Sequence, residues 1–482
     1  MKKRIGALMV ASVMACSAVV GLALTGCSSK QKANFVMPEG GFNTEASVKI
    51  KFYHTQGDAL NAVMKAHIAE FQKLYPNIEV EDTQVGGYDD VRNQISNEIM
   101  AGDQPNIAYC YPDHVAAFNK SGAVQPLNDF LSDGAFKDVK VKQADGTEVP
   151  LNMTAEQEAM FIEGYFQEGY KFDDETTMYT LPFSKSTEVL YYNKTKFDEW
   201  GLTAPKTWDE MEEVCKKIKE KDPSSIPLGY DSEANWFITM CEQYGSPYTS
   251  SKGEFLFDNE TNQAFVTRFK DWYEKKYVTT QAIYGAYTSG LFTATTGQRC
   301  YMCIGSSAGA SHQIPKPTTE TVDGVDTSVY PFTVDITTIP QVHPENPKVI
   351  SQGPSVCIFK SDNPQEVLAS WLLVKYLTTS INFQAEFGDA SGYVPVLKQE
   401  YIMKNETYKT KLEQKNGTNN LTYLSAYVCM QQEAAYYTSP AFVGSSDARD
   451  QVGLLMQVAL TNSKSVDRAF KDAIAECEYK VS

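Results

Sequence analysis

Apolar and polar residues alternate over residues 48–52 (VKIKF), and this alternation predicts a half-buried β-strand. Over residues 60–74 the apolar positions recur every three or four residues, as they do on one face of a helix. A second strand over 78–80, a second helix over 91–102 and a short apolar strand over 107–111 follow. This β-α-β-α-β order predicts an α/β domain with a mainly parallel sheet.

The second half of the chain repeats this kind of pattern after an irregular segment. Residues 132–178 are acidic and irregular, so we expect much of this segment to be a surface insertion and loops. Thr207 and Glu210 have the spacing of a capping box and predict a helix that ends near Lys219. Another helix is expected over 260–276. A second α/β unit is therefore expected, and ligands commonly bind in a cleft between two such units.

The N-terminus has the features of an export signal. Three of the first four residues are basic, an uncharged apolar run extends over 5–24, and Leu24-Thr25-Gly26-Cys27 follows. This tetrapeptide resembles the lipobox of bacterial lipoproteins, which implies that residues 1–26 are removed as a signal peptide and that Cys27 carries the lipid. Residues 27–46 would then be the lipidated N-terminus and a flexible tether. The alternative is an uncleaved transmembrane anchor.

Composition narrows the range of partners. The 482-residue chain has a formal net charge of −17, which is the wrong sign for binding nucleic acid or an anionic lipid surface. Ten cysteines are present, and Cys300 and Cys303 have a C-x-x-C spacing that occurs in zinc and redox sites. Because these two lie in an apolar segment without a second pair, we expect buried free thiols, no metal and no cofactor. The chain also lacks a phosphate-binding P-loop.

One motif suggests an enzyme. Residues 305–309 (GSSAG) fit the G-x-S-x-G pattern of an α/β-hydrolase nucleophile elbow, with Ser307 as the nucleophile. Asp335 and His343 would complete a triad in the correct order. However, the prolines in QIPKP (313–317) interrupt the helix that should follow the elbow, and the Asp and His lie only eight residues apart. We therefore expect no catalytic activity. A surface adhesin without a small ligand is a third possibility.

A set of phrases spread in order over nearly the whole body resembles one family. They are KFYHTQGDAL, FQKLYPNIEV, VGGYDDVRNQI, AGDQPNIAYCYPDHVAAF, GAVQPLNDF, LPFSKSTEVLYYNKTKF, APKTWDEM, CIGSSAG, ISQGPSVCIF and SGYVPV. The chain is similar to bacterial extracellular solute-binding proteins of the maltose-binding and glycerol-3-phosphate-binding type, which are receptors of ABC importers. The resemblance implies an α/β, two-lobed, type II periplasmic-binding-protein-like fold with a mixed sheet in each lobe.

The family fold also implies three crossings between the lobes, near residues 184–188, 351–353 and 394–396. The N-lobe would comprise 47–185 plus 353–395, and the C-lobe 186–352 plus 396–482. Such a receptor closes around its ligand by hinge motion and delivers it to a membrane permease. We expect a monomer, anchored by its lipid at the extracellular face of the cell membrane.

Seven candidate ligand-binding residues follow from the resemblance. Asp113 and Glu188 would accept charge-assisted hydrogen bonds from sugar hydroxyls, although an N-cap role is equally plausible for Asp113. Trp236 and Tyr393 would offer an aromatic face to a sugar ring, and packing in the core is the alternative for Trp236. The full set is Gln56, Tyr88, Asp113, Glu188, Trp236, Ser307 and Tyr393.

The resemblance also bears on the choice between a sugar and a phosphate ester. Glycerol-3-phosphate binders of the family use an arginine in a late glycine-rich loop, but this chain has Ser445 or Ser446 at that place. Arg449 aligns with a later arginine of the following helix. Because arginine is the usual partner of a phosphate and Glu188 would repel one, a neutral mono- or oligosaccharide is the favoured ligand. Glycerol-3-phosphate is the alternative.

Overall fold

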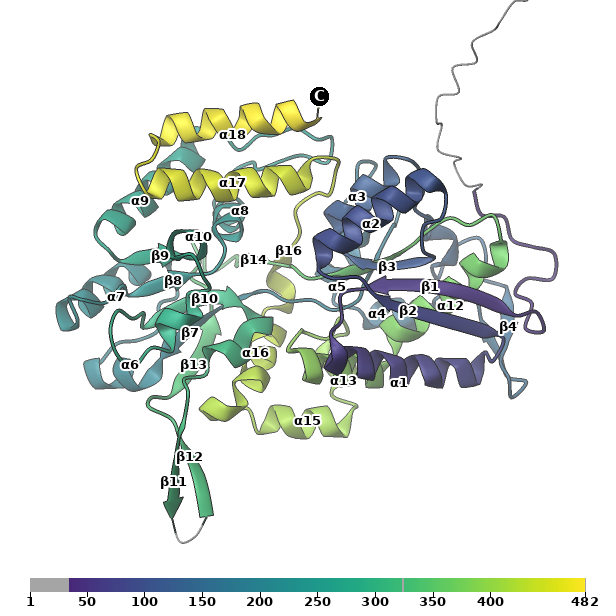
Figure 1. Cartoon of the computed structure of the whole chain (residues 1–482), viewed down its shortest axis with the longest axis horizontal. Helices are drawn as coiled ribbons and strands as arrows, with labels where there is room; N and C mark the ends of the chain where they lie inside the picture. Colours follow the sequence, from purple (N-terminus) through teal and green to yellow (C-terminus); the bar gives the residue numbers. More distant parts are fainter. Residues whose placement is uncertain (1–33, 323–324, 482) are drawn as a thin grey trace, which may run out of the picture.

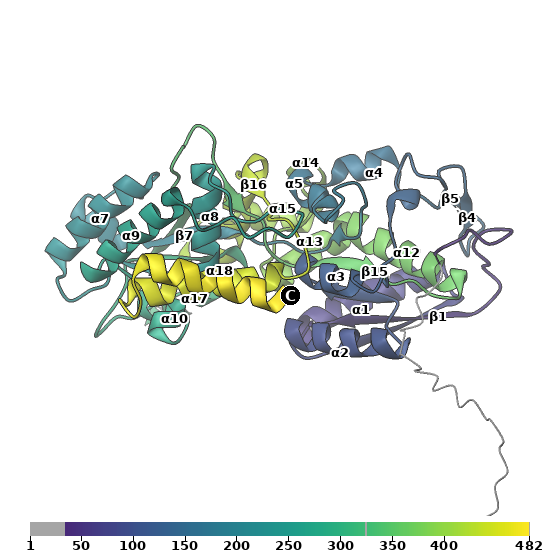
Figure 2. The ribbon, with the colours of Figure 1, turned by 90° about the horizontal axis from the view of Figure 1, so that it is seen from above.

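The computed structural model describes residues 34–322 and 325–481 and consists of two lobes that lie side by side (Figures 1 and 2). A five-stranded sheet forms the centre of the N-lobe, in the strand order β2-β1-β3-β15-β6. The first three strands are parallel, and β15 is antiparallel to both of its neighbours. The strands are β1 (Val48–His54), β2 (Ile78–Gln84), β3 (Ile107–Cys110), β15 (Ser355–Ile358) and β6 (Leu181–Pro182).

Helices cover both faces of this sheet because successive side chains of each strand point to opposite faces. Phe52 and Tyr109 contribute to the core cluster that includes residues of α1 and α12, whereas Tyr53 and Ala108 contribute to the cluster beneath α2 and α3. The alternation and helical periodicity predicted over residues 48–111 are thereby confirmed. The helices of the N-lobe sheet are α1 (Asp58–Leu74), α2 (Tyr88–Ala101), α3 (Pro112–Asn119), α12 (Pro364–Thr379) and α13 (Ile381–Ser391).

The C-lobe has a second five-stranded sheet, in the order β13-β7-β10-β8-β9. Its strands β10, β8 and β9 are parallel, and β7 is antiparallel to β10 and β13. The strands are β7 (Glu188–Asn193), β8 (Leu228–Tyr230), β9 (Val278–Thr280), β10 (Met302–Ser306) and β13 (Val334–Thr338).

Two of the C-lobe helices are predicted from the sequence, and both form, as α7 (Trp208–Lys221) and α9 (Glu260–Glu274). The Thr207 hydroxyl accepts from the amide of Glu210 at 3.1 Å and the Glu210 carboxylate accepts from the amide of Thr207 at 3.3 Å, so the predicted capping box is confirmed. The helices are α6 (Lys194–Trp200), α7 (Trp208–Lys221), α8 (Glu233–Tyr244), α9 (Glu260–Glu274), α10 (Gln281–Tyr284), α11 (Ser289–Phe292), α16 (Leu421–Met430), α17 (Ser445–Leu460) and α18 (Val466–Val481).

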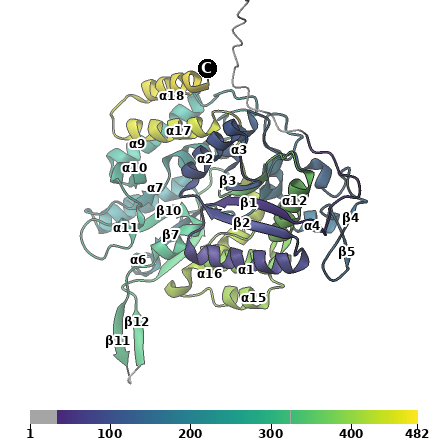
Figure 3. The ribbon, with the colours of Figure 1, turned by 45° about the vertical axis from the view of Figure 1, so that its right-hand side comes forward.

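The acidic segment 132–178 is more ordered than its sequence predicts. Residues 132–150 are mostly exposed turns and a short hairpin, as expected. Leu151 and Met153 are nevertheless buried against the N-lobe and short helices follow over 155–170, so the expectation of surface loop was wrong for this part only. A hairpin formed by β11 and β12 projects from the C-lobe (Figure 3). The remaining elements are β4 (Lys140–Lys142), β5 (Glu148–Pro150), α4 (Ala155–Met160), α5 (Glu163–Gln167), β11 (Thr318–Val322), β12 (Val325–Val329), β14 (Val349–Ile350), α14 (Gln399–Ile402), α15 (Glu406–Glu413) and β16 (Tyr436–Tyr437).

The segment expected to be a flexible tether is partly attached to the N-lobe. Phe35 packs on Phe130 with ring centroids 5.3 Å apart, and Phe42 is buried against Tyr75. These two phenylalanines are the reason why residues 34–46 do not form the free tether that we expected. The signal peptide and Cys27 lie outside the described residues. In the described parts of the chain, no helix has the length and apolar character needed to cross a bilayer.

Three segments of the chain, around Lys185, Gln352 and Val394, run side by side between the two sheets. Backbone bridges join Lys185 to Val394 and Ser186 to Gln352. Gly353 lies against the first of these segments with a φ of +100°, and a Cβ atom at this position would stand 2.7 Å from the carbonyl oxygen of Ser184. Only glycine therefore allows such a close approach of the two segments.

A buried ion pair fills the space beside these segments. The Lys185 ammonium contacts the Glu168 carboxylate, and the two side chains are 0% and 2% exposed. Lys185 also donates to the carbonyl of Gly353 at 3.0 Å, and the Glu168 carboxylate accepts from the hydroxyl of Ser355 at 2.9 Å. The pair thus connects α5 and its following turn to two of the three connecting segments.

We expect Glu168→Gln or Lys185→Met alone to lower the free energy of unfolding by about 3–5 kcal/mol, because each leaves one buried charge without its counter-ion. The double variant should lose less than either single variant, since no charge then remains buried. Urea unfolding of the four proteins measures these differences. Lys49→Met, which breaks an exposed pair with Glu79, should leave stability unchanged. Equal losses in the double and single variants would contradict the explanation.

Candidate functional site

Two adjoining pockets lie between and beside the lobes. The large pocket has a volume of about 580 Å³, and the small pocket about 290 Å³. Gln352 and Arg449 line both pockets and thus form the wall between them. The large pocket is lined by Glu188, Asp231, Ser232, Asn235, Gln281, Tyr287, Ser289, Gly305, Ser306, Ala308, Gly309, His312, Gln313, Gln352 and Arg449.

The sheet of the C-lobe places the polar groups of the large pocket. Strands β8 and β10 are parallel, and β7 runs antiparallel to β10, so the carboxyl ends of the first two lie at the same edge as the amino end of β7. Glu188 begins β7, Asp231 follows β8, and Ser306 ends β10 directly opposite Glu188. This edge is where open α/β sheets present groups to a ligand.

Glu188 is the most perturbed acid of the large pocket. Its side chain is 1% exposed, and its carboxylate accepts a hydrogen bond from the hydroxyl of Tyr230 at 2.7 Å. Burial raises the pKa of Glu188 from its ordinary value of 4.5 to about 7, because the charged form loses hydration. Hydrogen bonds from Tyr230 and Asn235 and the positive charge of Arg449 oppose this rise. The group is therefore partly ionised at neutral pH, and its charged form is an acceptor held at the wall of the pocket.

A short hydrogen-bonded chain crosses between the two pockets. The Asn235 amide donates to the Gln352 side-chain oxygen at 2.7 Å, and its own oxygen accepts from the guanidinium of Arg449. Asn235 is on α8, Arg449 is on α17, and Gln352 belongs to one of the segments that connect the lobes. Sequence reasoning missed all three as site residues. Gln352 had the clearest signal, since it lies within a predicted crossing.

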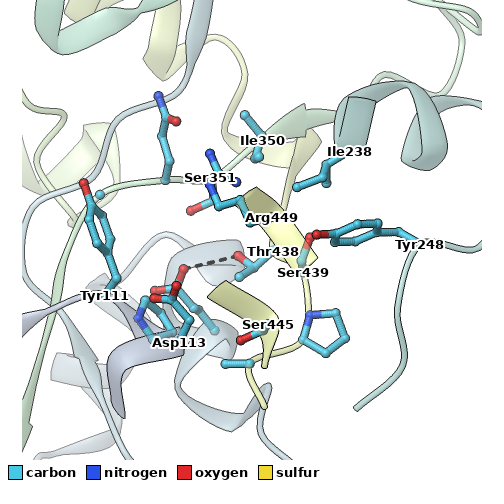
Figure 4. A pocket seen from close by; sticks show the side chains of 16 residues that line it. Tyr111, Asp113, Ile238, Tyr248, Ile350, Ser351, Thr438, Ser439, Ser445 and Arg449 are labelled. Atoms are coloured by element: carbon cyan, nitrogen blue, oxygen red, sulfur yellow. Dashed lines mark hydrogen bonds between the residues drawn. The ribbon is translucent and has the colours of Figure 1, made fainter. Parts of the chain in front are cut away.

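The small pocket contains groups from both lobes. Tyr111 and Asp113 come from the N-lobe, at the N-cap and in the first turn of α3, whereas Ile238, Tyr248 and the start of α17 come from the C-lobe. Tyr111 and Tyr248 lie on opposite sides of this pocket, and the hydroxyl of Tyr248 points inward (Figure 4). The full lining is Tyr111, Pro112, Asp113, Glu168, Ile238, Tyr248, Ile350, Ser351, Gln352, Gly353, Thr438, Ser439, Pro440, Ala441, Ser445 and Arg449.

Tyrosines cluster on the N-lobe. The rings of Tyr88 and Tyr111 have centroids 4.4 Å apart, and the hydroxyls of Tyr88 and Tyr393 are 3.4 Å apart. Burial raises the pKa of both Tyr88 and Tyr393, so the two phenols are neutral at physiological pH. Gln56 is buried, and among the described residues its amide nitrogen has no hydrogen-bond partner. The structure thus brings the predicted residues Tyr88 and Tyr393 together.

The other predicted residues divide between the pockets and the core. Glu188 lines the large pocket and Asp113 the small pocket. Asp113 also accepts from the backbone amide of His114 at 3.0 Å. Ser307 is buried, its hydroxyl accepts from the amide of Thr187 at 3.1 Å, and it lines neither pocket. Its neighbours Ser306 and Ala308 line the large pocket.

Trp236 lies in the core of the C-lobe and lines neither pocket. Its side chain is 0% exposed and stacks on Tyr230, with ring centroids 4.8 Å apart, and it lies tilted against the ring of Phe269 at 4.1 Å. The expectation that it offers a face to the ligand is therefore wrong. The physical reason is that α8 turns this side chain towards α7 and α9, where the aromatic cluster excludes water.

The alternatives that involve catalysis or metals do not match the geometry. Ser307 bonds to Thr187, whereas Asp335 accepts from the hydroxyl of Tyr192 at 2.6 Å and the exposed His343 faces Glu345. Cys300 and Cys303 are buried free thiols, as predicted, and burial raises the pKa of both. Among the described residues, no group of three or more His, Cys, Asp or Glu side chains is arranged to hold a metal ion.

Comparison with known proteins gives a consistent result. Residues 53–382 match the sequence model of the family described as bacterial extracellular solute-binding protein. The chain is 25% identical over 207 residues to the multiple sugar-binding protein of Streptococcus mutans, a match that covers 43% of the chain and 42% of that protein. It is 26% identical over 222 residues to the sn-glycerol-3-phosphate-binding periplasmic protein UgpB of Escherichia coli K12, covering 44% and 45%. These matches span less than half of each curated relative.

Solved structures share the fold along almost the whole chain. The structure of UgpB from Mycobacterium tuberculosis in complex with glycerophosphocholine has a TM-score of 0.69 at 16% identity, with 90% of this chain and 99% of that chain covered. The cyclic α-maltosyl-1,6-maltose binding protein of Arthrobacter globiformis has a TM-score of 0.67 at 16% identity, covering 91% and 100%. The predicted two-lobed binding-protein fold is thus confirmed, and these relatives are binding proteins rather than enzymes.

The raised pKa of Glu188 predicts a pH-dependent stability. Below pH 4.5 the carboxyl group is protonated in both the folded and the unfolded chain. Between pH 4.5 and about 7 the unfolded chain releases this proton while the folded protein retains it, so the contribution of Glu188 to stability falls as the pH rises. Relative to Glu188→Gln, the wild type should therefore lose about 3 kcal/mol over this range.

The measurement is the free energy of unfolding of both proteins at pH 4.5, 5.5, 6.5 and 7.5. The difference between them should change with pH up to about 7 and then become constant. Glu213→Gln, at an exposed position of α7, is the matched control and should show no such trend. A difference between the wild type and Glu188→Gln that does not vary with pH would show that the carboxylate is not buried as described.

Proposed function

Because the chain belongs to the family of bacterial extracellular solute-binding proteins, we propose that it is a receptor of an ABC importer that binds a neutral mono- or oligosaccharide between its lobes and delivers it to a membrane permease. The family and fold support a binding role without catalysis. The observation that carries the choice of ligand is the buried Glu188 carboxylate at the wall of the large pocket, within reach of hydroxyl donors.

The composition of the large pocket fits a polyhydroxyl ligand. Carboxylates, amides and hydroxyls line it, and sugar hydroxyls both donate and accept hydrogen bonds. The exposed ring of Tyr287 adds an aromatic surface, to which the C–H face of a sugar ring can pack. The name of the Streptococcus mutans relative, a multiple sugar-binding protein, favours the same class of ligand.

The position of Gln352 supports coupling between ligand binding and hinge closure. Gln352 contributes to both pockets and is hydrogen-bonded through its backbone to Ser186 in the neighbouring segment. A ligand that contacts it therefore binds to the hinge itself. To move an open–closed equilibrium from 1:99 to 99:1, a ligand must prefer the closed state by about 5.5 kcal/mol, which several such contacts can supply. The permease would then recognise the closed form.

Glycerol-3-phosphate remains the second candidate because of Arg449. The predicted loss of the phosphate-binding arginine rested on Ser445 and Ser446, yet Arg449 of α17 reaches both pockets. The name of the Escherichia coli relative also favours this ligand. Against it, the same pockets contain the carboxylates of Glu188 and Asp113, which repel a dianionic phosphate. We therefore place the neutral sugar first.

The cellular context is also part of the proposal. We propose that residues 1–26 are removed and that Cys27 is lipidated, which would hold a monomeric receptor at the extracellular face of the cell membrane. We also propose lobe boundaries of 47–185 plus 353–395 and 186–352 plus 396–482. The backbone bridges of Lys185 with Val394 and of Ser186 with Gln352 support these boundaries.

A ligand panel tests the proposal and separates its two candidates. Thermal unfolding of the purified protein is followed with monosaccharides, disaccharides and glycerol-3-phosphate. A ligand that binds only the native state should add about 2.7 kcal/mol of stability at a hundredfold excess over its dissociation constant. We expect the melting temperature to rise with a sugar.

The variant Glu188→Gln moves the two candidates in opposite directions. It removes an ionised acceptor, so a bound sugar should be weakened about tenfold or more. It also removes a negative charge, so glycerol-3-phosphate should bind more tightly. Glu213→Gln again serves as the matched control on an exposed helix. Stabilisation by glycerol-3-phosphate alone, enhanced in Glu188→Gln, would overturn the sugar assignment, and no shift with any compound would contradict both.

A further inference from the structure

The small pocket contains buried hydroxyls that the protein leaves without partners. Ser351 is only 6% exposed, and its hydroxyl oxygen finds no hydrogen-bond partner among the described residues. The buried hydroxyl oxygen of Tyr248 likewise has none within the described part of the chain. Both side chains line the pocket, and the Tyr248 hydroxyl points into it (Figure 4). Because buried polar groups in native proteins are nearly always hydrogen-bonded, these two hydroxyls are free to bond to a molecule that enters the pocket.

The other groups of the small pocket define the chemistry of this molecule. Ile238 and Ile350 supply apolar surface beside the two hydroxyls. The Glu168 carboxylate also lines the pocket, but Lys185 and Ser355 already satisfy it. The carboxylate of Asp113 and the guanidinium of Arg449 also line the pocket and can accept from and donate to hydroxyl groups. This mixture of apolar surface and polar groups suits an uncharged ring that carries hydroxyl groups and apolar C–H faces. A pyranose has this combination of surfaces.

The small pocket is continuous with the large one. Gln352 and Arg449 belong to the linings of both, and their side chains are held in place by Asn235. A linear molecule that lies across these two residues would occupy both pockets at once. Its first unit would face Glu188, and its second unit would lie between Tyr111 and Tyr248.

We propose that the small pocket is a second sugar subsite, so that the ligand is a disaccharide or a longer glycan with one unit in each pocket. Tyr248 and Ser351 are then the residues that select for chain length. This inference rests on the proposed function, because it requires the large pocket to bind a sugar.

The test uses Tyr248→Phe and Ser351→Ala, singly and together. Since neither hydroxyl has a partner among the described residues, their removal should not lower the melting temperature. Binding is measured by calorimetry with glucose, maltose and maltotriose and with galactose, lactose, mannose and mannobiose. For the series that binds, we expect the disaccharide to bind more tightly than the monosaccharide. Each variant should weaken disaccharide binding about tenfold and leave monosaccharide binding unchanged.

Tyr165→Phe is the matched control. The hydroxyl of Tyr165 is also buried and without a partner among the described residues. However, the ring of Tyr165 stacks on that of Tyr436, and Tyr165 lines neither pocket. This variant should bind every sugar as the wild type does. Equal affinity for monosaccharide and disaccharide, or disaccharide binding that is unchanged in Tyr248→Phe/Ser351→Ala, would overturn the inference while sugar binding itself stands. Failure of the whole panel in the wild type would instead contradict the proposed function.

Discussion

The ion pair between Lys185 and Glu168 holds together the place where the two lobes meet. Neither side chain has access to water, so each charge depends on the other and on the hydrogen bonds from Ser355 and to Gly353. Such a pair requires its surroundings to fit closely, and the glycine at 353 permits that fit by letting two backbone segments approach within van der Waals contact. The segments between the lobes cannot separate without exposing or stranding a charge, so the two lobes stay joined at this point.

Much of the fold was predictable because burial on two faces imposes a regular pattern on the chain. The alternation at 48–52 and the helical period at 60–74 both arise from packing against the same N-lobe core. The prediction failed for 151–170 and 34–46, where a few isolated apolar residues such as Leu151 and Phe35 anchor irregular backbone. These residues are held in place by partners far away in the sequence and do not belong to a repeating pattern of apolar positions. The sequence pattern therefore does not predict that they are buried.

The site was less predictable than the fold. Glu188 and Asp113 were found because each lies at a strand end or turn whose phrase resembles the family. The prediction that Trp236 contacts the ligand was wrong for a physical reason. An aromatic residue on an amphipathic helix usually packs in the core, and here Trp236 stacks on Tyr230. Arg449 and Tyr248 were missed because they reach the pockets only through the packing of α8, α9 and α17. Nothing near them in the sequence distinguishes them from ordinary surface residues.

The charges between the pockets constrain what the protein can hold. Arg449 is held by Asn235 close enough to Glu188 to lower the cost of ionising that carboxylate, and burial raises this cost again. A ligand with a full negative charge would compete with Glu188 for Arg449, whereas a hydroxyl can accept from the guanidinium and donate to the carboxylate at once. Because Asn235 also bonds to Gln352 in the segment between the lobes, the neutral ligand of the proposed function would be joined to this segment through the same contacts. In the proposed function, selectivity and closure would thus both depend on this one small hydrogen-bonded group.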